Sequence, residues 1–111
     1  MEAIDRNLAI IRPKKPYLDW VRSLPNPDKD ITLEELRLDC STFLIPAEDS
    51  PQEGTVFLEK HFREIFEYEL SSWDLESKNW PSSFTLQMFR DWFDLEIHTL
   101  VIDLVEEEPE E

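Results

Sequence analysis

The segment that reads NLAIIRP at residues 7–13 is a short apolar run that a proline closes. Uninterrupted runs of this length are typical of strands that are buried on both faces. Two later runs resemble it, TFLI at residues 42–45 and IHTLVI at residues 97–102. The sequence therefore predicts three strands. Because both faces of the last strand turn apolar after His98, we expect that strand in the middle of the sheet.

Short helices are predicted between and beside these strands. Apolar residues recur every three or four positions over residues 17–24, which is typical of one face of a helix. Thr32 and Glu35 form a capping box, so a second short helix is expected from about residue 33. Thr85 has the same capping character and predicts a third short helix before the last strand.

The longest predicted helix has a strong start signal. Ser50, Pro51 and Glu53 supply an N-cap, a first-turn proline and a capping-box glutamate in the order that a helix requires. We expect this helix to end near Ser72. Its inner face is a stripe of apolar side chains at helical period, with Leu70 at the margin: Leu58, Phe62, Ile65, Phe66 and Trp73.

This order of elements predicts an α+β or small α/β fold, in which one long and several short helices cover a three-stranded mixed or parallel sheet. The composition, 41% hydrophobic and 12% aromatic, supports a folded core. We expect a single α+β domain over residues 1–105. Residues 106–111 read EEEPEE and offer nothing to bury, so they are predicted to be a disordered acidic tail.

Glycine and cysteine usage excludes several classes of function. The chain has one glycine, Gly54, and one cysteine, Cys40. A P-loop or a dinucleotide fingerprint needs several glycines, and a disulfide or a Cys-pair zinc site needs a second cysteine. The sequence implies no cofactor. The lone cysteine, the missing signal-peptide pattern and the absence of a long apolar run predict a cytoplasmic protein with no membrane contact.

The formal net charge of −15 is unevenly distributed along the chain. Residues 1–37 hold seven acidic and seven basic side chains, so the whole surplus of acid lies in residues 38–111. Nucleic acids bind through Lys and Arg on their phosphates, so this charge argues against a nucleic-acid partner. It favours a basic protein partner. We therefore expect a non-enzymatic interaction protein.

The alternative is a small metal-binding protein or an enzyme that uses Asp94, Glu96 and His98. These residues stand two positions apart, so they share one face if the last strand begins at Asp94. Two carboxylates and an imidazole can bind a transition metal or carry out acid–base chemistry. Against this, a histidine is more often a half-buried structural residue. We expect His61 to pack at the edge of the core and Cys40 to pack as a small apolar side chain, although both could also join His98 in a site.

Four further residues have both a structural and a functional interpretation. Arg12, Lys14 and Lys15 form a basic cluster after the first strand, which either neutralises the acidic part of the fold or binds a small anionic ligand. Trp80 lies in a predicted loop over residues 74–83. Its indole either folds back to cap the core or marks a partner-binding surface.

Four strings are distinctive: IRPKKPYLDW at residues 11–20, FLIP at residues 43–46, WP at residues 80–81 and WFDLEIH at residues 92–98. In these strings the chain resembles a group of short acidic bacterial proteins of unassigned function, and the resemblance spans most of the chain. It implies a bacterial, cytoplasmic, single-domain protein. It carries no activity, ligand or catalytic residue.

Overall fold

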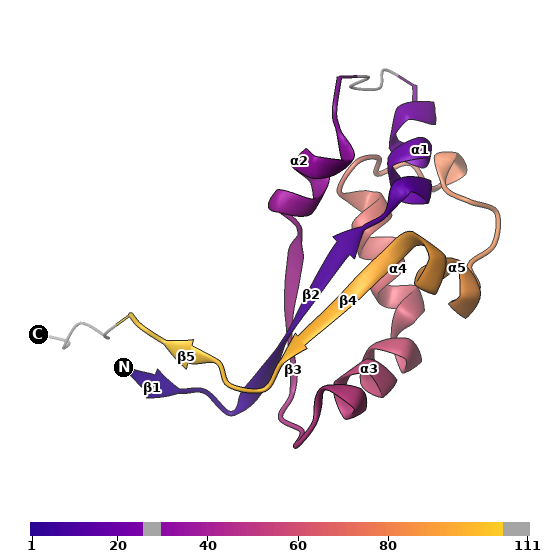
Figure 1. Ribbon diagram of the computed structural model, residues 1–111. Coiled ribbons are helices and arrows are strands. Elements are labelled where there is room, and N and C mark those ends of the chain that lie inside the picture. Colours follow the sequence, from indigo (N-terminus) through magenta and orange to yellow (C-terminus); the bar gives the residue numbers. More distant parts are fainter. Residues whose placement is uncertain (26–29, 106–111) are drawn as a thin grey trace, which may run out of the picture.

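The computed structural model describes residues 1–25 and 30–105, so the predicted acidic tail at residues 106–111 lies outside the described residues. The fold is α+β, as predicted (Figure 1). Its elements are, in chain order, β1 (Glu2–Ala3), β2 (Arg6–Pro13), α1 (Lys15–Ser23), α2 (Leu33–Leu38), β3 (Ser41–Pro46), α3 (Pro51–Lys60), α4 (Phe62–Ser71), a 3-10 turn (Ser77–Asn79), α5 (Leu86–Trp92), β4 (Phe93–His98) and β5 (Ile102–Asp103). None of the described helices has the length and apolar composition that crossing a membrane requires.

The main sheet has three strands in the order β3-β2-β4, and both outer strands run antiparallel to β2. The prediction of a mixed or parallel sheet is therefore wrong. The chain leaves β2 at Pro13, and helices α1 and α2 return it to the same end of the sheet. The first residue of β3, Ser41, therefore pairs with Ile11. Helices α3 to α5 carry the chain back to the same end, where Phe93 pairs with Pro13.

The last strand is an edge strand, which corrects the prediction that it is central. It also begins and ends earlier than predicted, because β4 stops at His98 and the chain then pairs Ile102 with Ala3 in a separate two-stranded sheet. The acidic side chains at alternate positions of β4 explain the placement. Charged side chains are better accommodated on an edge strand than between two neighbours.

Only one face of the sheet is fully buried, whereas the sequence predicted burial on both faces. Along β2, Asn7, Ala9, Ile11 and Pro13 are buried, and the residues between them are partly or fully exposed. Figure 1 shows α3, α4 and α5 together on one side of the sheet. On β3, Leu44 is 58% exposed. The described helices leave the other face partly open to solvent, and the sheet therefore has an inner and an outer face.

Aromatic rings fill the space between the inner face and the helices. Phe66 of α4 is fully buried, and its ring centroid lies 5.1 Å from Phe84, 5.1 Å from Trp92 and 5.5 Å from Phe93. Tyr17 joins the same cluster from α1, 5.2 Å from Phe93. Rings at these separations add favourable edge and stacking contacts to the burial of their area. This cluster fixes α4 and α5 on the sheet.

The predicted helix starts are confirmed by their capping hydrogen bonds. The Thr32 hydroxyl accepts from the backbone N–H of Glu35 at 3.2 Å, and the Thr85 hydroxyl accepts from Met88 at 3.1 Å. Ser50 caps α3 in the same way. Each bond satisfies a backbone donor that the first turn of a helix leaves unpaired, which is why these positions begin helices.

The single long helix of the prediction is two helices, α3 and α4, which meet at His61. The backbone of His61 leaves the helical region (φ −110°, ψ 18°). Leu58 of α3 is buried near the sheet, whereas Phe66 of α4 is buried against the aromatic cluster. The apolar stripe of one straight helix would face a single surface. The break at His61 lets α3 pack on the sheet and α4 pack on the aromatic cluster.

Candidate functional site

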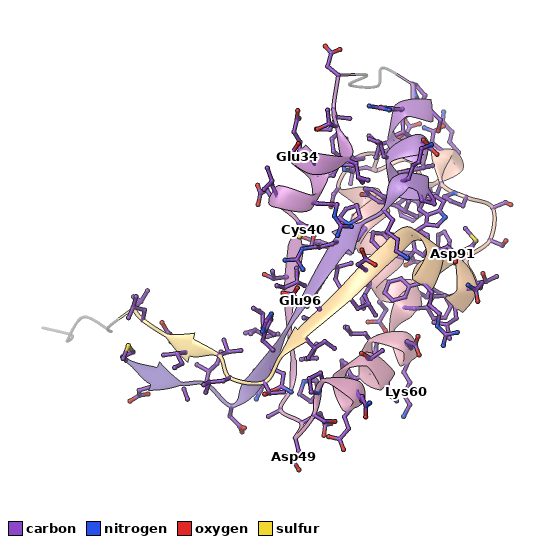
Figure 2. All side chains as sticks on the ribbon, viewed as in Figure 1. Glu34, Cys40, Asp49, Lys60, Asp91 and Glu96 are labelled. Atoms are coloured by element: carbon purple, nitrogen blue, oxygen red, sulfur yellow. The ribbon has the colours of Figure 1, made fainter. Side chains whose placement is uncertain are left out.

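Asp94, Glu96 and His98 share the outer face of β4, as their spacing predicts. Figure 2 labels Glu96, which lies on β4 between the other two. An Arg12 Nη1 donates to Glu96 Oε1 at 2.7 Å, and His98 Nε2 lies 2.7 Å from the other carboxylate oxygen. These two hydrogen bonds, first that with His98 and then that with Arg12, hold the pKa of Glu96 below its usual value.

Asp94 at the start of the same strand lies between two cations. Arg37 Nη1 donates to Asp94 Oδ2 at 2.9 Å, and Lys14 Nζ lies 3.7 Å from Asp94 Oδ1. Lys15 pairs separately with Asp19 on α1, at 3.3 Å. The basic cluster therefore neutralises nearby carboxylates, which agrees with the structural interpretation of its residues.

These ion pairs also bear on the metal hypothesis. Within residues 1–25 and 30–105, no three His, Cys, Asp or Glu side chains are arranged to hold a metal ion. Asp94 and Glu96 direct oxygens to Arg37 and Arg12, where a metal would have to compete with a guanidinium. The geometry of this face is that of a surface ion-pair network.

Cys40, His61 and His98 occupy three different places. Cys40 lies where α2 leads into β3 (Figure 2). His61 stands at the junction of α3 and α4, where its ring packs at a tilt against Phe57 with centroids 4.4 Å apart and Nδ1 lies 3.6 Å from Glu64 Oε1. His98 is on the outer face of the sheet. The structure does not assemble these residues into one site.

Trp80 folds back onto the protein. Its ring is half-buried against the core, and its indole N–H donates to the Asp74 carbonyl at 2.8 Å. Trp20 holds the same loop from α1, because its indole N–H donates to the Asn79 carbonyl at 3.0 Å. Trp80 therefore has the arrangement expected of a side chain that caps the core. Its ring is only partly exposed and its indole N–H is already hydrogen-bonded, which argues against the partner-surface interpretation.

A different surface has the shape of a binding site. A groove of about 410 Å³ runs between the edge strand β3 and helices α3 and α4; we call it the β3 groove. Its lining combines three consecutive strand residues with side chains from both helices: Phe43, Leu44, Ile45, Phe57, Leu58, His61, Glu64, Ile65 and Tyr68. The rings of Phe43 and Tyr68 meet edge to face at 5.7 Å. The lining is mostly apolar and contains neither Lys nor Arg.

The sequence analysis missed this groove, although one signal for it is present. Phe57, His61, Glu64 and Tyr68 are spaced by four, three and four residues, so they form a second helical stripe beside the buried one. Tyr68 ends that stripe and is 56% exposed. A second helical stripe that carries aromatic residues indicates that the helices have more apolar surface than the core buries.

Comparison of the chain with models of known protein families, with curated proteins and with solved structures found no match.

Proposed function

We propose that this protein is a non-enzymatic interaction domain that binds a basic segment of a partner protein in the β3 groove. The observation that carries the proposal is an open apolar groove beside a sheet edge, with a carboxylate and no Lys or Arg in its lining. An extended segment can dock at such an edge through its backbone while alternate side chains enter the groove.

Apolar contacts supply the first part of the argument. The rings of Tyr68 and Phe43 contact each other in the lining of the groove, and Phe57 adds a third aromatic ring. A volume of about 410 Å³ lies within the range of specific binding pockets and accommodates a few side chains. Exposed aromatic residues are enriched among the anchors of protein interfaces, so these rings are suitable anchor points.

Charge supplies the second part. Glu64 lines the groove, and its carboxylate lies 3.6 Å from His61 Nδ1 and forms no ion pair with Lys or Arg. A neighbouring hollow shares Phe57 with the groove and adds Glu48 and Glu53, together with Lys60. Figure 2 shows Asp49 near the start of α3 and Lys60 at its other end. Most charges along this side are negative, so it favours a cationic segment.

The surplus of carboxylates in the described part of the chain also favours a basic partner. Between residues 38 and 105, ten of the fourteen carboxylates form no ion pair with Lys or Arg. Three basic side chains of the first third, those of Arg12, Lys14 and Arg37, pair with Asp94 and Glu96. A surplus of this kind steers basic partners toward the surface and slows their approach when salt is added.

The test is a titration followed by two-dimensional NMR. The probe is a short synthetic peptide of alternating lysine and leucine, and the matched probe replaces each lysine by glutamate. We expect the lysine peptide to shift amide signals of β3, α3 and α4, and the glutamate peptide to shift none. Shifts that spread evenly over the surface, or that centre on β4, would contradict the proposal.

Two variants sharpen this test. Tyr68→Ala should weaken binding of the lysine peptide because it removes an exposed aromatic ring from the lining of the groove. Leu75→Ala is the matched control, since Leu75 is 85% exposed and lies outside the groove. Equal binding by both variants would show that charge alone attracts the peptide, and the groove would then have no role.

A further inference from the structure

A second hollow, distinct from the β3 groove, lies between α4 and the turn from α2 into β3. It has a volume of about 310 Å³, and we call it the Glu69 pocket. The side chains with functional groups that line it include Tyr17, Asp39, Cys40, Ser41, Glu69 and Trp73. Its lining contains no Lys or Arg.

Glu69 is the unusual member of this lining. The residue is 5% exposed, and its Oε1 atom has no hydrogen-bond partner. Burial raises the pKa of the Glu69 carboxyl, and a hydrogen bond from Ser41 acts in the opposite direction. Buried carboxyl groups are normally fully hydrogen-bonded, so the Glu69 carboxyl group, which lines this hollow and has one unpartnered oxygen, lacks a hydrogen-bond donor.

The groups around Glu69 do not supply that donor. The Tyr17 hydroxyl donates to the backbone carbonyl of Glu69 at 2.6 Å, so its proton is already used. Burial, and then the negative charge of Glu69, raise the pKa of Tyr17, which therefore stays protonated. The other titratable groups of the lining are Asp39 and Cys40, which add no positive charge.

We propose that the Glu69 pocket binds a small organic ammonium compound, whose N–H groups donate to the Glu69 carboxylate and whose charge is balanced by Glu69 and Asp39. Trp73, which is 37% exposed, adds an aromatic ring to the lining, and the faces of such rings attract cations. The volume of about 310 Å³ suits a compound with few heavy atoms.

This arrangement predicts a pH dependence. An ammonium ion pairs with the ionised carboxylate, whereas burial favours the protonated form of Glu69 in the free protein. Where the free protein holds a proton on Glu69, binding releases it, so the affinity rises with pH through that range and levels off once Glu69 is ionised in the free protein as well. Tyr17, Asp39 and Cys40 face the same hollow, but none of them needs to change its proton for the ligand to bind.

The test measures binding of n-butylammonium by isothermal calorimetry, with n-butanol and butyrate as the uncharged and anionic probes of similar shape. We expect heat of binding from butylammonium alone. At a pH where Glu69 holds its proton in the free protein, that heat should vary with the ionisation enthalpy of the buffer, because the buffer takes up the released proton. Glu69→Gln keeps the shape and should weaken binding about tenfold or more. Glu67→Gln, on the exposed side of the same helix, is the matched control and should bind as the unchanged protein does.

Three results would overturn the proposal. They are equal binding of butanol and butylammonium, equal binding by the Glu69→Gln and Glu67→Gln variants, and the absence of any heat at millimolar butylammonium. If Glu69→Gln failed to fold, the unchanged protein would still decide the question. A fourth result, affinity that falls as pH rises, would exclude ionised Glu69 as the partner of the ligand.

Discussion

Replacing Gly54 by alanine tests how closely α3 packs on the sheet. A Cβ atom at this position would lie 2.8 Å from Ile97 Cδ1, 3.0 Å from Ile97 Cγ2 and 3.1 Å from Ile45 Cδ1. Carbon atoms in contact normally stay about 3.5–4.0 Å apart. The helix must therefore move outward, or both isoleucines must rotate, before an alanine fits.

Two opposing effects set the change in the free energy of unfolding that Gly54→Ala should cause. Alanine is favoured over glycine inside a helix by about 1 kcal/mol. Overfilling a packed core costs about 1–3 kcal/mol. We expect Gly54→Ala to lower the free energy of unfolding by about 1 kcal/mol, because three short contacts to two strands outweigh the helix preference. In a domain of this size that loss lowers Tm by about 4 °C.

The assay is urea unfolding of a double-mutant cycle with Ile97→Val, which removes the Cδ1 atom at 2.8 Å. Ile97→Val alone should cost about 0.5–1.5 kcal/mol. The double variant should lose about 1 kcal/mol less than the sum of the single losses, since the shortest contact is gone. If Gly54→Ala stabilises the protein, or if the two changes are additive, α3 does not approach β4 as closely as described.

Three other outcomes are expected. Phe66→Ala should lower the free energy of unfolding by about 3–5 kcal/mol in chemical denaturation, because its fully buried ring contacts four aromatic neighbours; a loss below about 1 kcal/mol would contradict the packing. Glu96 should titrate below its usual pKa by NMR, and Arg12→Ala should move that pKa upward by removing a hydrogen bond to the ionised form; an unchanged value would rule out the contact. Tm should rise between low salt and ~150 mM salt, because screening relieves the repulsion within a chain of net charge −15; a fall would mean that ion pairs outweigh repulsion.

The raised pKa of Glu69 sets the direction in which pH changes the stability of the folded protein. Its pKa is raised in the folded protein, so the folded state holds this proton more tightly than the unfolded state does. The stability that Glu69 contributes is therefore full below its unfolded pKa and declines as pH rises toward the folded pKa. Glu69→Gln should remove this decline, which denaturation at several pH values will show. A steeper decline in the variant would contradict the raised pKa.

Local patterns in the sequence were enough to locate most elements. Thr32, Ser50 and Thr85 each place a hydroxyl where the first turn of a helix needs an acceptor, and each does so in the structure. The apolar runs at residues 7–13 and 42–45 became β2 and β3. The face shared by Asp94, Glu96 and His98 was also predictable, since side chains on a strand alternate.

What the tertiary structure alone decided is how those elements meet. The antiparallel pairing, the central place of β2 and the break at His61 depend on contacts between residues far apart in the chain, which no local period encodes. Glu69 shows that local sequence does not reveal the surroundings of a single residue either. It lies between Ile65 and Trp73 on the predicted apolar stripe, but only the folded surroundings reveal that its Oε1 has no donor. Local sequence fixes the backbone geometry of short segments, whereas burial and partners are properties of the whole packed chain.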